Sequence, residues 1–251
     1  MHATRFLMGM PVTVDVPQGS DEVIEAAFAR FAEIEARFST FRPESEVVRF
    51  NELRLYQGEP SSELREVLAL AERTRRETDG YFDIARPDGF LDPTGIVKGW
   101  AIRDVARLIE AWPGEGGGFA DYLVDAGGDI QCRGNAPDGE PWRIGIRNPF
   151  NAMEIVKIVA PRDRGIATSG TSARGQHIYD PHAPGRKISD VLSITVIGPD
   201  VLEADRFATA AFAMGEDGIR FIEAQPGLEG YVIGADRVAI QTTGFREFVI
   251  S

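Results

Sequence analysis

The chain has 251 residues, of which 43% are hydrophobic and 26% are charged, and its formal net charge is −12. This length and composition fit one large globular domain or two fused halves, and they exclude a disordered chain. The acidic balance argues against a nucleic-acid-binding surface, which needs clustered lysines and arginines, but it is compatible with simple solubility and with a site for a hard cation.

The first half of the chain predicts helices separated by loops. Residues 12–16 alternate as a strand does, and Ser20 is a candidate N-cap for the helix that follows. Residues 39–51 are polar and predict a surface loop entering a short helix, whereas the Gly-, Pro- and Asp-rich residues 81–99 are typical of a functional loop. Apolar periodicity predicts helices over residues 21–38, 62–78 and 98–111.

The second half predicts mostly strands. A helix of small residues is expected over 204–214, and the Pro- and Gly-rich residues 112–118 before this half are either a hinge or a surface loop. The pattern predicts a single α+β domain over residues 1–251 with largely antiparallel sheet. Strands are expected over residues 122–125, 130–133, 142–146, 155–159, 191–197, 231–233, 238–241 and 248–250, the last of which closes the sheet.

The ends of the chain and its cysteine content bear on compartment and redox chemistry. Residues 1–5 do not begin a secretion leader, and no apolar run is long enough to span a bilayer. The chain as written is therefore expected to be cytoplasmic, although a chain trimmed of a leader would look the same. Cys132 is the single cysteine, which excludes a disulfide framework and a thiolate metal cluster, and we expect it to be a small strand residue.

The segment 203–209 is the first candidate for chemistry. Asp205 and Thr209 are four residues apart, so on a helix their carboxylate and hydroxyl share a face. Both are hard oxygen ligands of the kind that Mg²⁺ accepts together with substrate phosphates and water. An ordinary helix N-terminus, where the dipole favours an acidic residue, explains the pattern equally simply.

Two glycine-rich segments could approach an anion closely. Residues 80–85 and 91–101 combine glycines with an expected helix start, where free N–H groups face outward, and Lys98 could add a positive charge next to a pyrophosphate. The spacing is not that of a Walker A loop, and turns with helix caps explain the glycines without a ligand. In the segment 126–129, Gly127 and Gly128 are either a tight turn or a surface against which a ring or phosphate lies.

The segments 166–172 and 175–181 carry hydroxyl groups and a histidine. His177, with Asp180 three residues later, suits a general base near a phosphoryl centre, and His182 follows closely. Zinc is a poor fit, because two histidines without further soft ligands are too few. A purely structural histidine is the competing interpretation.

Read in order, these segments resemble the ApbE family of flavin transferases. That family shows a Met-Gly-Thr near the start, a Ser-Thr-Tyr segment followed by Ser-Glu and Asn, a Gly-x-Phe-Asp turn, a Lys-Gly-Tyr-Ala stretch, Ala-Gly-Gly-Asp, Thr-Ser-Gly, His-Ile-x-Asp-Pro and Ala-Asp-x-x-Ala-Thr. The chain carries Met8-Gly9, Ser39-Thr40-Phe41, Ser45-Glu46 and Asn51, followed by every later element in the same order. The resemblance covers nearly the whole chain.

The resemblance implies an ApbE/T-fold-like architecture, with mixed, largely antiparallel sheets packed with helices and an FAD site in the cleft between two fused halves. It implies Mg²⁺-dependent transfer of the FMN part of FAD to a Ser or Thr hydroxyl of an acceptor protein, with release of AMP. His177 or a carboxylate such as Asp205 would take the proton. Oxygen atoms of Gly95, Asp205, Ala208 and Thr209 would hold the metal. The FAD site would be lined by Met8, Phe41, Tyr81, Phe82, Asp83, Asp92, Lys98, His177 and Ile178.

The chain departs from the family pattern at several positions. Met10 stands in place of the threonine, Phe41 in place of the tyrosine, and Arg103 in place of an aspartate that usually follows Trp100-Ala101. The segment Pro93-Thr94-Gly95 stands where Leu-Gly-Gly is commoner. The leader and lipid-attachment cysteine of many members are missing, so the resemblance implies a periplasmic or membrane-anchored protein only if a leader was removed. The alternatives are an Mg²⁺-dependent FAD pyrophosphatase, which gives FMN and AMP, and a non-catalytic FAD-binding protein.

Overall fold

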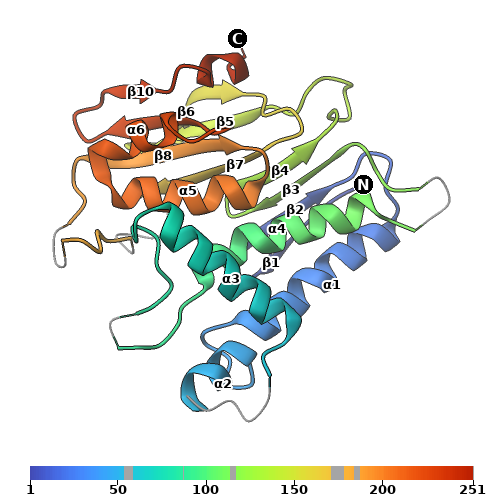
Figure 1. Cartoon of the computed structure of the whole chain (residues 1–251). Coiled ribbons are helices and arrows are strands. Elements are labelled where there is room, and N and C mark those ends of the chain that lie inside the picture. Colours follow the sequence, from blue (N-terminus) through green and yellow to red (C-terminus); the bar gives the residue numbers. More distant parts are fainter. Residues whose placement is uncertain (54–58, 87, 114–116, 171–177, 184–186, 251) are drawn as a thin grey trace.

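The computed structural model describes residues 1–53, 59–86, 88–113, 117–170, 178–183 and 187–250 (Figure 1). At its centre lies an eight-stranded sheet in which neighbouring strands are antiparallel, which confirms the predicted α+β class. In spatial order its strands are β1 (His2–Leu7), β2 (Met10–Asp15), β3 (Tyr122–Ala126), β4 (Asp129–Arg133), β7 (Gly165–Gly170), β8 (Val191–Gly198), β9 (Glu229–Gly234) and β10 (Ala239–Gln241). A second antiparallel pair consists of β5 (Ile144–Asn148) and β6 (Asn151–Val159).

Helices cover one face of the large sheet. The α-helices are α1 (Asp21–Phe38), α2 (Glu46–Leu53), α3 (Ser62–Glu77), α4 (Thr94–Glu110), α5 (Val201–Ala213) and α6 (Gly218–Glu223). Figure 1 shows α1, α4 and α5 side by side in front of the strands, and their contacts agree: α1 packs on β1 and β2, α4 on β3 and β4, and α5 on β4, β7 and β8. None of the helices among the described residues has the length and apolar character needed to cross a membrane.

The middle of the sheet is buried on both faces. In β4, four consecutive residues from Asp129 to Cys132 are buried, because α5 covers one face and the β5–β6 pair packs on the other through Trp142 and Ile146. Strand β2 alternates instead, because its second face lacks such a cover. Burial raises the pKa of the Cys132 thiol to about 12, which makes it a poor nucleophile and agrees with its expected role as a strand residue.

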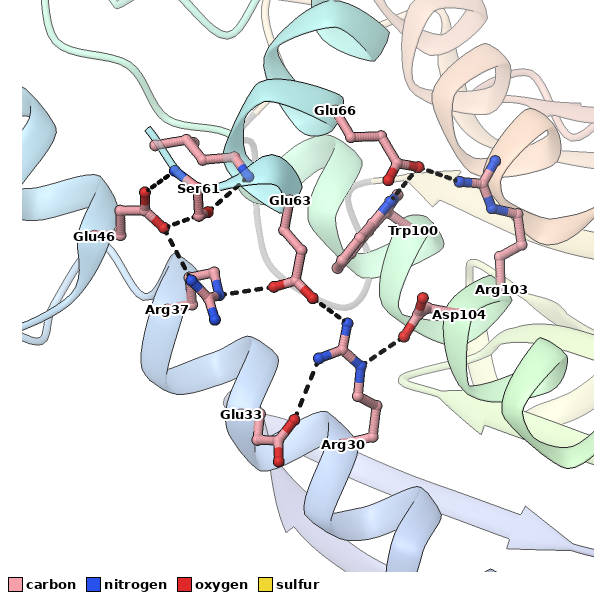
Figure 2. A network of polar contacts seen from close by, with 11 residues as sticks. Arg30, Glu33, Arg37, Glu46, Ser61, Glu63, Glu66, Trp100, Arg103 and Asp104 are labelled. Atoms are coloured by element: carbon pink, nitrogen blue, oxygen red, sulfur yellow. Dashed lines mark hydrogen bonds and ion pairs between the residues drawn. The ribbon is translucent and has the colours of Figure 1, made fainter. Parts of the chain in front are cut away.

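A network of ion pairs joins the helices on the outer side of this layer (Figure 2). Arg30 of α1 donates to Glu63 of α3 and to Asp104 of α4, at 2.6 Å in both cases. Arg37 lies seven residues later in α1, on the same side of the helix, and pairs with Glu63 at 2.7 Å and with Glu46 of α2 at 3.2 Å. Charged side chains held from several directions fix helix positions better than single surface pairs do, so this network orients α2 and α3 relative to α4.

Two segments that match the family pattern, Ser45-Glu46 and Asn51, make structural contacts around α2. The Ser45 hydroxyl accepts from the N–H of Val48 and caps α2, while Glu46 accepts from the N–H and hydroxyl of Ser61, the N-cap of α3. The Asn51 amide binds the backbone N–H and carbonyl of Leu91 at 2.9 and 2.8 Å. These contacts tie the loop after α3 to α2, which places the residues that precede α4.

The structure corrects several boundaries. Strands β1 and β7 and helix α6 were not expected, and residues 248–250 do not form the predicted closing strand. A 3-10 helix at Phe245–Phe248 replaces it, and Val249 makes only an isolated bridge to Val159. Helix α5 begins three residues before the predicted start because Asp200 accepts from the Glu203 N–H and caps it there. The suggested hinge over 112–118 stays a prediction, since residues 114–116 lie outside the described part of the chain.

Candidate active site

The candidate residues converge at one end of the large sheet. Two hairpin turns lie there side by side: Met8-Gly9 joins β1 to β2, and Gly127-Gly128 joins β3 to β4, with the Gly127 N–H donating to the Pro11 carbonyl at 3.1 Å. Because β7 runs antiparallel to β4, its last residues also reach this end. The sheet therefore gathers segments that are far apart in the sequence.

The Gly127-Gly128 turn explains why Asp129 occupies its position. Both glycines have positive φ, 64° and 96°, as a two-residue hairpin turn requires. A Cβ at position 127 would also lie only 2.9 Å from the Met10 sulfur, so the Met10 side chain would have to shift to admit one. Of the two interpretations left open for this segment, the tight turn is confirmed, and it delivers Asp129 as the first residue of β4.

Asp129, Lys98 and Asp205 form a buried charged cluster. The Lys98 ammonium pairs with Asp129 and lies 3.4 Å from the Asp205 carboxylate. Asp129 and Asp205 are 2% and 3% exposed, and the N–H of Thr168 in β7 donates to Asp129 at 3.0 Å. The cluster joins α4, β4, β7 and α5, and it carries two carboxylates for one ammonium.

Gly99 allows α4 and α5 to approach closely enough to form this cluster. A Cβ there would lie 3.0 Å from the Leu202 Cα and 3.1 Å from Asp205. The Gly99 N–H donates to the Asp205 carboxylate at 3.1 Å. In a regular helix that N–H binds the carbonyl four residues earlier, which belongs to Gly95, so Asp205 competes with that carbonyl for its donor.

Thr209 lies one turn beyond Asp205 on α5, as the spacing predicts. Its hydroxyl is 3.4 Å from the hydroxyl of Ser169 in β7. Ala208 differs, since its side chain is fully buried in the core under α5 and could contribute only a backbone oxygen to a site. The end of the sheet thus presents carboxylate and hydroxyl oxygens together.

The electrostatics of the cluster favour an added positive charge. Burial raises the pKa of the Asp205 carboxyl to about 7; nearby Asp129 adds to the rise, and Lys98 opposes it. No group of three or more Asp, Glu, His or Cys side chains that could hold a metal occurs among the described residues. A cation bound here would therefore draw on hydroxyl, backbone or substrate oxygens besides Asp205, a donor set that suits Mg²⁺ and not zinc.

Two adjacent aromatic residues, Tyr81 and Phe82, lie in the segment between α3 and α4. The rings of Tyr81 and His182 lie 4.5 Å apart, and the His182 Nε2 atom is 2.7 Å from the Asp79 carbonyl oxygen. Phe82 is only 4% exposed, and its ring lies directly under Gly95, where a Cβ would be 3.4 Å away. Phe82 therefore packs against the first turn of α4, whereas the Tyr81 side chain is partly exposed to solvent.

The remaining predicted residues fall into three groups. Asp83 and Asp92 accept from backbone N–H groups two residues ahead, so both shape the loop, and Asp92 also explains why α4 begins at Thr94 and not at residue 98. Met8 and Ile178 are half-buried at the edges of the core, and Phe41 is 92% exposed in the loop before α2. His177 lies outside the described residues.

Two residues of the cluster were not selected from the sequence. Asp129 was noted only as the end of a glycine turn and Ser169 only as part of a hydroxyl-rich segment. An acidic residue at the start of an expected strand was the available signal for Asp129, because a carboxylate that becomes buried needs a partner. Nothing in the sequence pairs Ser169 with Thr209, since strand and helix meet only in the fold.

Comparisons with known proteins identify the family of the chain. A sequence profile of the ApbE family matches residues 8–88 and 85–232. An FAD:protein FMN transferase of Escherichia coli is 32% identical over 184 residues, which cover 68% of this chain and 51% of the relative, and one of Vibrio cholerae is 33% identical over 66% and 49%. The chain thus spans about half the length of these curated relatives.

Solved structures extend the likeness to the whole fold. The flavin transferase ApbE from Vibrio cholerae superposes with a TM-score of 0.83 at 26% identity, covering 99% of this chain and 98% of that one. An ApbE protein from Thermotoga maritima gives a TM-score of 0.86 at 20% identity, which supports the fold alone.

Proposed function

The chain belongs to the ApbE family, and from that premise we propose that it transfers the FMN part of FAD to a Ser or Thr hydroxyl of an acceptor protein and releases AMP. The observation that carries the proposal is the buried cluster of Lys98, Asp129 and Asp205 beside the hydroxyls of Ser169 and Thr209. The proposal is supported by this combination of one ammonium with several hard oxygen atoms, which is the chemistry that binding a pyrophosphate together with a cation requires.

We propose that Asp205, the Thr209 hydroxyl and the Gly95 carbonyl hold Mg²⁺, with the Ala208 carbonyl as a further ligand. The fit rests on the excess of carboxylate over ammonium in the cluster and on the contact that brings Asp205 into competition with the Gly95 carbonyl. Bound there, Mg²⁺ supplies positive charge to the phosphate oxygens of the substrate and so favours displacement at phosphorus.

Mg²⁺ is expected to stabilise the protein more at pH 8 than at pH 5. The pKa of Asp205 is raised in the folded chain from 3.8 to about 7, so without a cation the protein loses stability as the pH rises through that window. A bound cation reverses this loss, and at about 100 times its Kd it should raise Tm by roughly 5 °C or more at pH 8. Thermal unfolding in MgCl₂ and in NaCl of equal ionic strength measures the difference. An equal Mg²⁺ effect at both pH values, or one retained by Asp205→Ala, would contradict the assignment.

In the proposed reaction the acceptor oxygen forms a bond to the phosphorus of the FMN half, and the bond from that phosphorus to the bridging oxygen breaks. AMP leaves with the bridging oxygen, and the hydroxyl proton passes to a base. Lys98 binds the pyrophosphate charge, and its ion pair with Asp129 holds the lysine side chain in position. His177 and Asp205 are the candidate bases. A cation on Asp205 would lower its pKa, so His177 is then the better proton acceptor.

The flavin end of the substrate is proposed to lie along the loop after α3. Tyr81 offers a partly exposed ring braced by His182, and Met8 and Ile178 offer half-buried apolar surface. Asp83 and Asp92 stabilise the loop conformation through hydrogen bonds, and Phe82 packs beneath the start of α4. Because Phe41 is 92% exposed, we propose that its ring contacts the bound flavin.

The products separate transfer from the two alternatives. The protein is incubated with FAD and Mg²⁺, with and without an acceptor peptide that contains a serine or threonine near small residues, and nucleotides are resolved by chromatography. Transfer predicts AMP without matching free FMN, and only when the peptide is present. Equal FMN and AMP regardless of peptide would indicate a pyrophosphatase, and bound but unchanged FAD would indicate a non-catalytic flavin-binding protein.

A further inference from the structure

A pocket opens at the end of β4 away from the candidate active site. Its volume is about 350 Å³, a size that admits a small ligand. It is lined by the C-terminal half of α4, by Tyr122 and Arg133 at the paired ends of β3 and β4, and by the residues just before α5. Lys98 and Asp129 lie at the opposite ends of α4 and β4, so this pocket is separate from the proposed transfer site.

Three arginines and three acidic residues are among the residues that line the pocket. Arg103 and Arg107 are four residues apart on α4 and share the face that lines it, and Arg133 joins them from β4. Guanidinium groups present several N–H donors in a planar fork that matches the oxygens of phosphate and carboxylate groups. Such a gathering of arginines stands out in a chain whose net charge is −12.

Donors of these arginines remain open. Arg103 donates to Glu66 at 3.1 Å, but its Nε–H is buried and binds no described acceptor (Figure 2). No hydrogen bond or ion pair joins the exposed Arg107 side chain to the part of the chain that the structure describes. Burial and the neighbouring Arg107 lower the pKa of Arg103, as expected where positive charge is not fully compensated.

The carboxylates of the pocket already have partners. Glu110 accepts from the Tyr122 hydroxyl at 2.6 Å and pairs with Arg133 at 3.2 Å. Asp200 caps α5 through the Glu203 N–H, and Asp163 accepts from the Gly134 N–H at 2.7 Å. Glu110 thus engages Arg133 and the other two acidic groups bind backbone N–H groups, which leaves the Arg107 guanidinium for a ligand.

We propose that this pocket binds a small oxyanion of the phosphate class, either free phosphate or the phosphate group of a nucleotide. Arg103, one of its two α4 arginines, stands where the family pattern usually has an aspartate, so the site would distinguish this chain from members that keep the acidic residue. The proposal is independent of the flavin-transfer reaction, since none of the pocket residues belongs to the buried lysine cluster.

The test is an NMR titration of ¹⁵N-labelled protein with inorganic phosphate, with AMP and with adenosine, each at constant ionic strength. Inorganic phosphate should shift the amide signals of residues 103–110 and 131–133 and leave those around Gly99 and Asp205 unmoved. Adenosine, which lacks the oxyanion, should leave both sets unmoved. An affinity for AMP like that for phosphate identifies the oxyanion as the whole ligand, whereas a much tighter AMP complex identifies a nucleotide.

Arg107→Ala is the decisive variant because its side chain is exposed and its loss leaves no described partner unpaired. It should weaken phosphate binding by about tenfold or more. Arg220→Ala is the matched control, since this arginine is 86% exposed and its ion-pair partner among the described residues is Asp217, three positions earlier. This variant should bind phosphate like the unaltered chain. The proposal is overturned if phosphate shifts no signals of the pocket or if Arg107→Ala binds it with unchanged affinity.

Discussion

Asp205→Ala is expected to reduce kcat/KM for FAD on the order of 1,000-fold or more while FAD binding falls only modestly. The carboxylate is buried, holds the Gly99 N–H and faces Lys98, so its removal takes away the one acidic side chain proposed to bind the cation. The flavin and adenine ends of FAD would keep their contacts elsewhere. Steady-state kinetics gives the first quantity, and quenching of flavin fluorescence gives the second.

Asp205→Asn is the companion variant because it keeps the volume of the side chain and removes its charge. It should fold as the unaltered chain does, lose turnover to a similar degree and lose the Mg²⁺-dependent rise in Tm. If either variant turned FAD over at the original rate, Asp205 could be neither a metal ligand nor the base.

Lys98→Met is expected to impair both activity and stability. Turnover should fall by about 10²- to 10³-fold, because the positive charge next to the transferred phosphate is lost. The variant also leaves Asp129 and Asp205 buried without the ammonium that now separates them, and losing one partner of a buried pair costs about 3 kcal/mol of unfolding free energy. Denaturant titration measures that loss.

The pH dependence of Lys98→Met has a defined sign. Lys98 lowers the folded-state pKa of Asp205, so without the lysine that pKa rises further, and the stability deficit should be large at pH 8 and shrink towards pH 5, where protonation removes the charge. Lys157→Met, on β6 across the sheet, removes a cation that lies 5.0 Å from the Tyr231 ring and should show no such trend. A deficit that did not change with pH would mean that Lys98 acts through packing alone.

Local patterns were enough to predict much of the fold. The apolar spacing of residues 21–38 matches α1 end to end, and the two glycines before Asp129 predict a turn because only glycine readily adopts that backbone. The C-terminal strand was wrong because an apolar run such as Phe248–Ile250 fits a strand or a short helical turn equally well. Strand β1 is largely exposed, so it lacks the apolar alternation by which β2 was found.

The candidate site was predictable only in part, for a related reason. Asp205 and Thr209 share one helix, so their spacing places both on one face. The Lys98–Asp129 pair joins a helix to a strand thirty-one positions away in the chain, and Asp205 reaches the same ammonium because Gly99 admits α5 so closely. Contacts of that kind depend on how the layers pack, which the spacing of residues within one element does not encode.

The most direct test of the proposed function is the mass of the acceptor. The protein is incubated with FAD, Mg²⁺ and a set of peptides that each carry a single serine or threonine, and each peptide is then weighed. A reactive peptide should gain the mass of FMN less one water, with an equal amount of AMP in solution, and its Ser→Ala or Thr→Ala counterpart should gain nothing. Consumption of FAD to FMN and AMP without any change in peptide mass would contradict transfer.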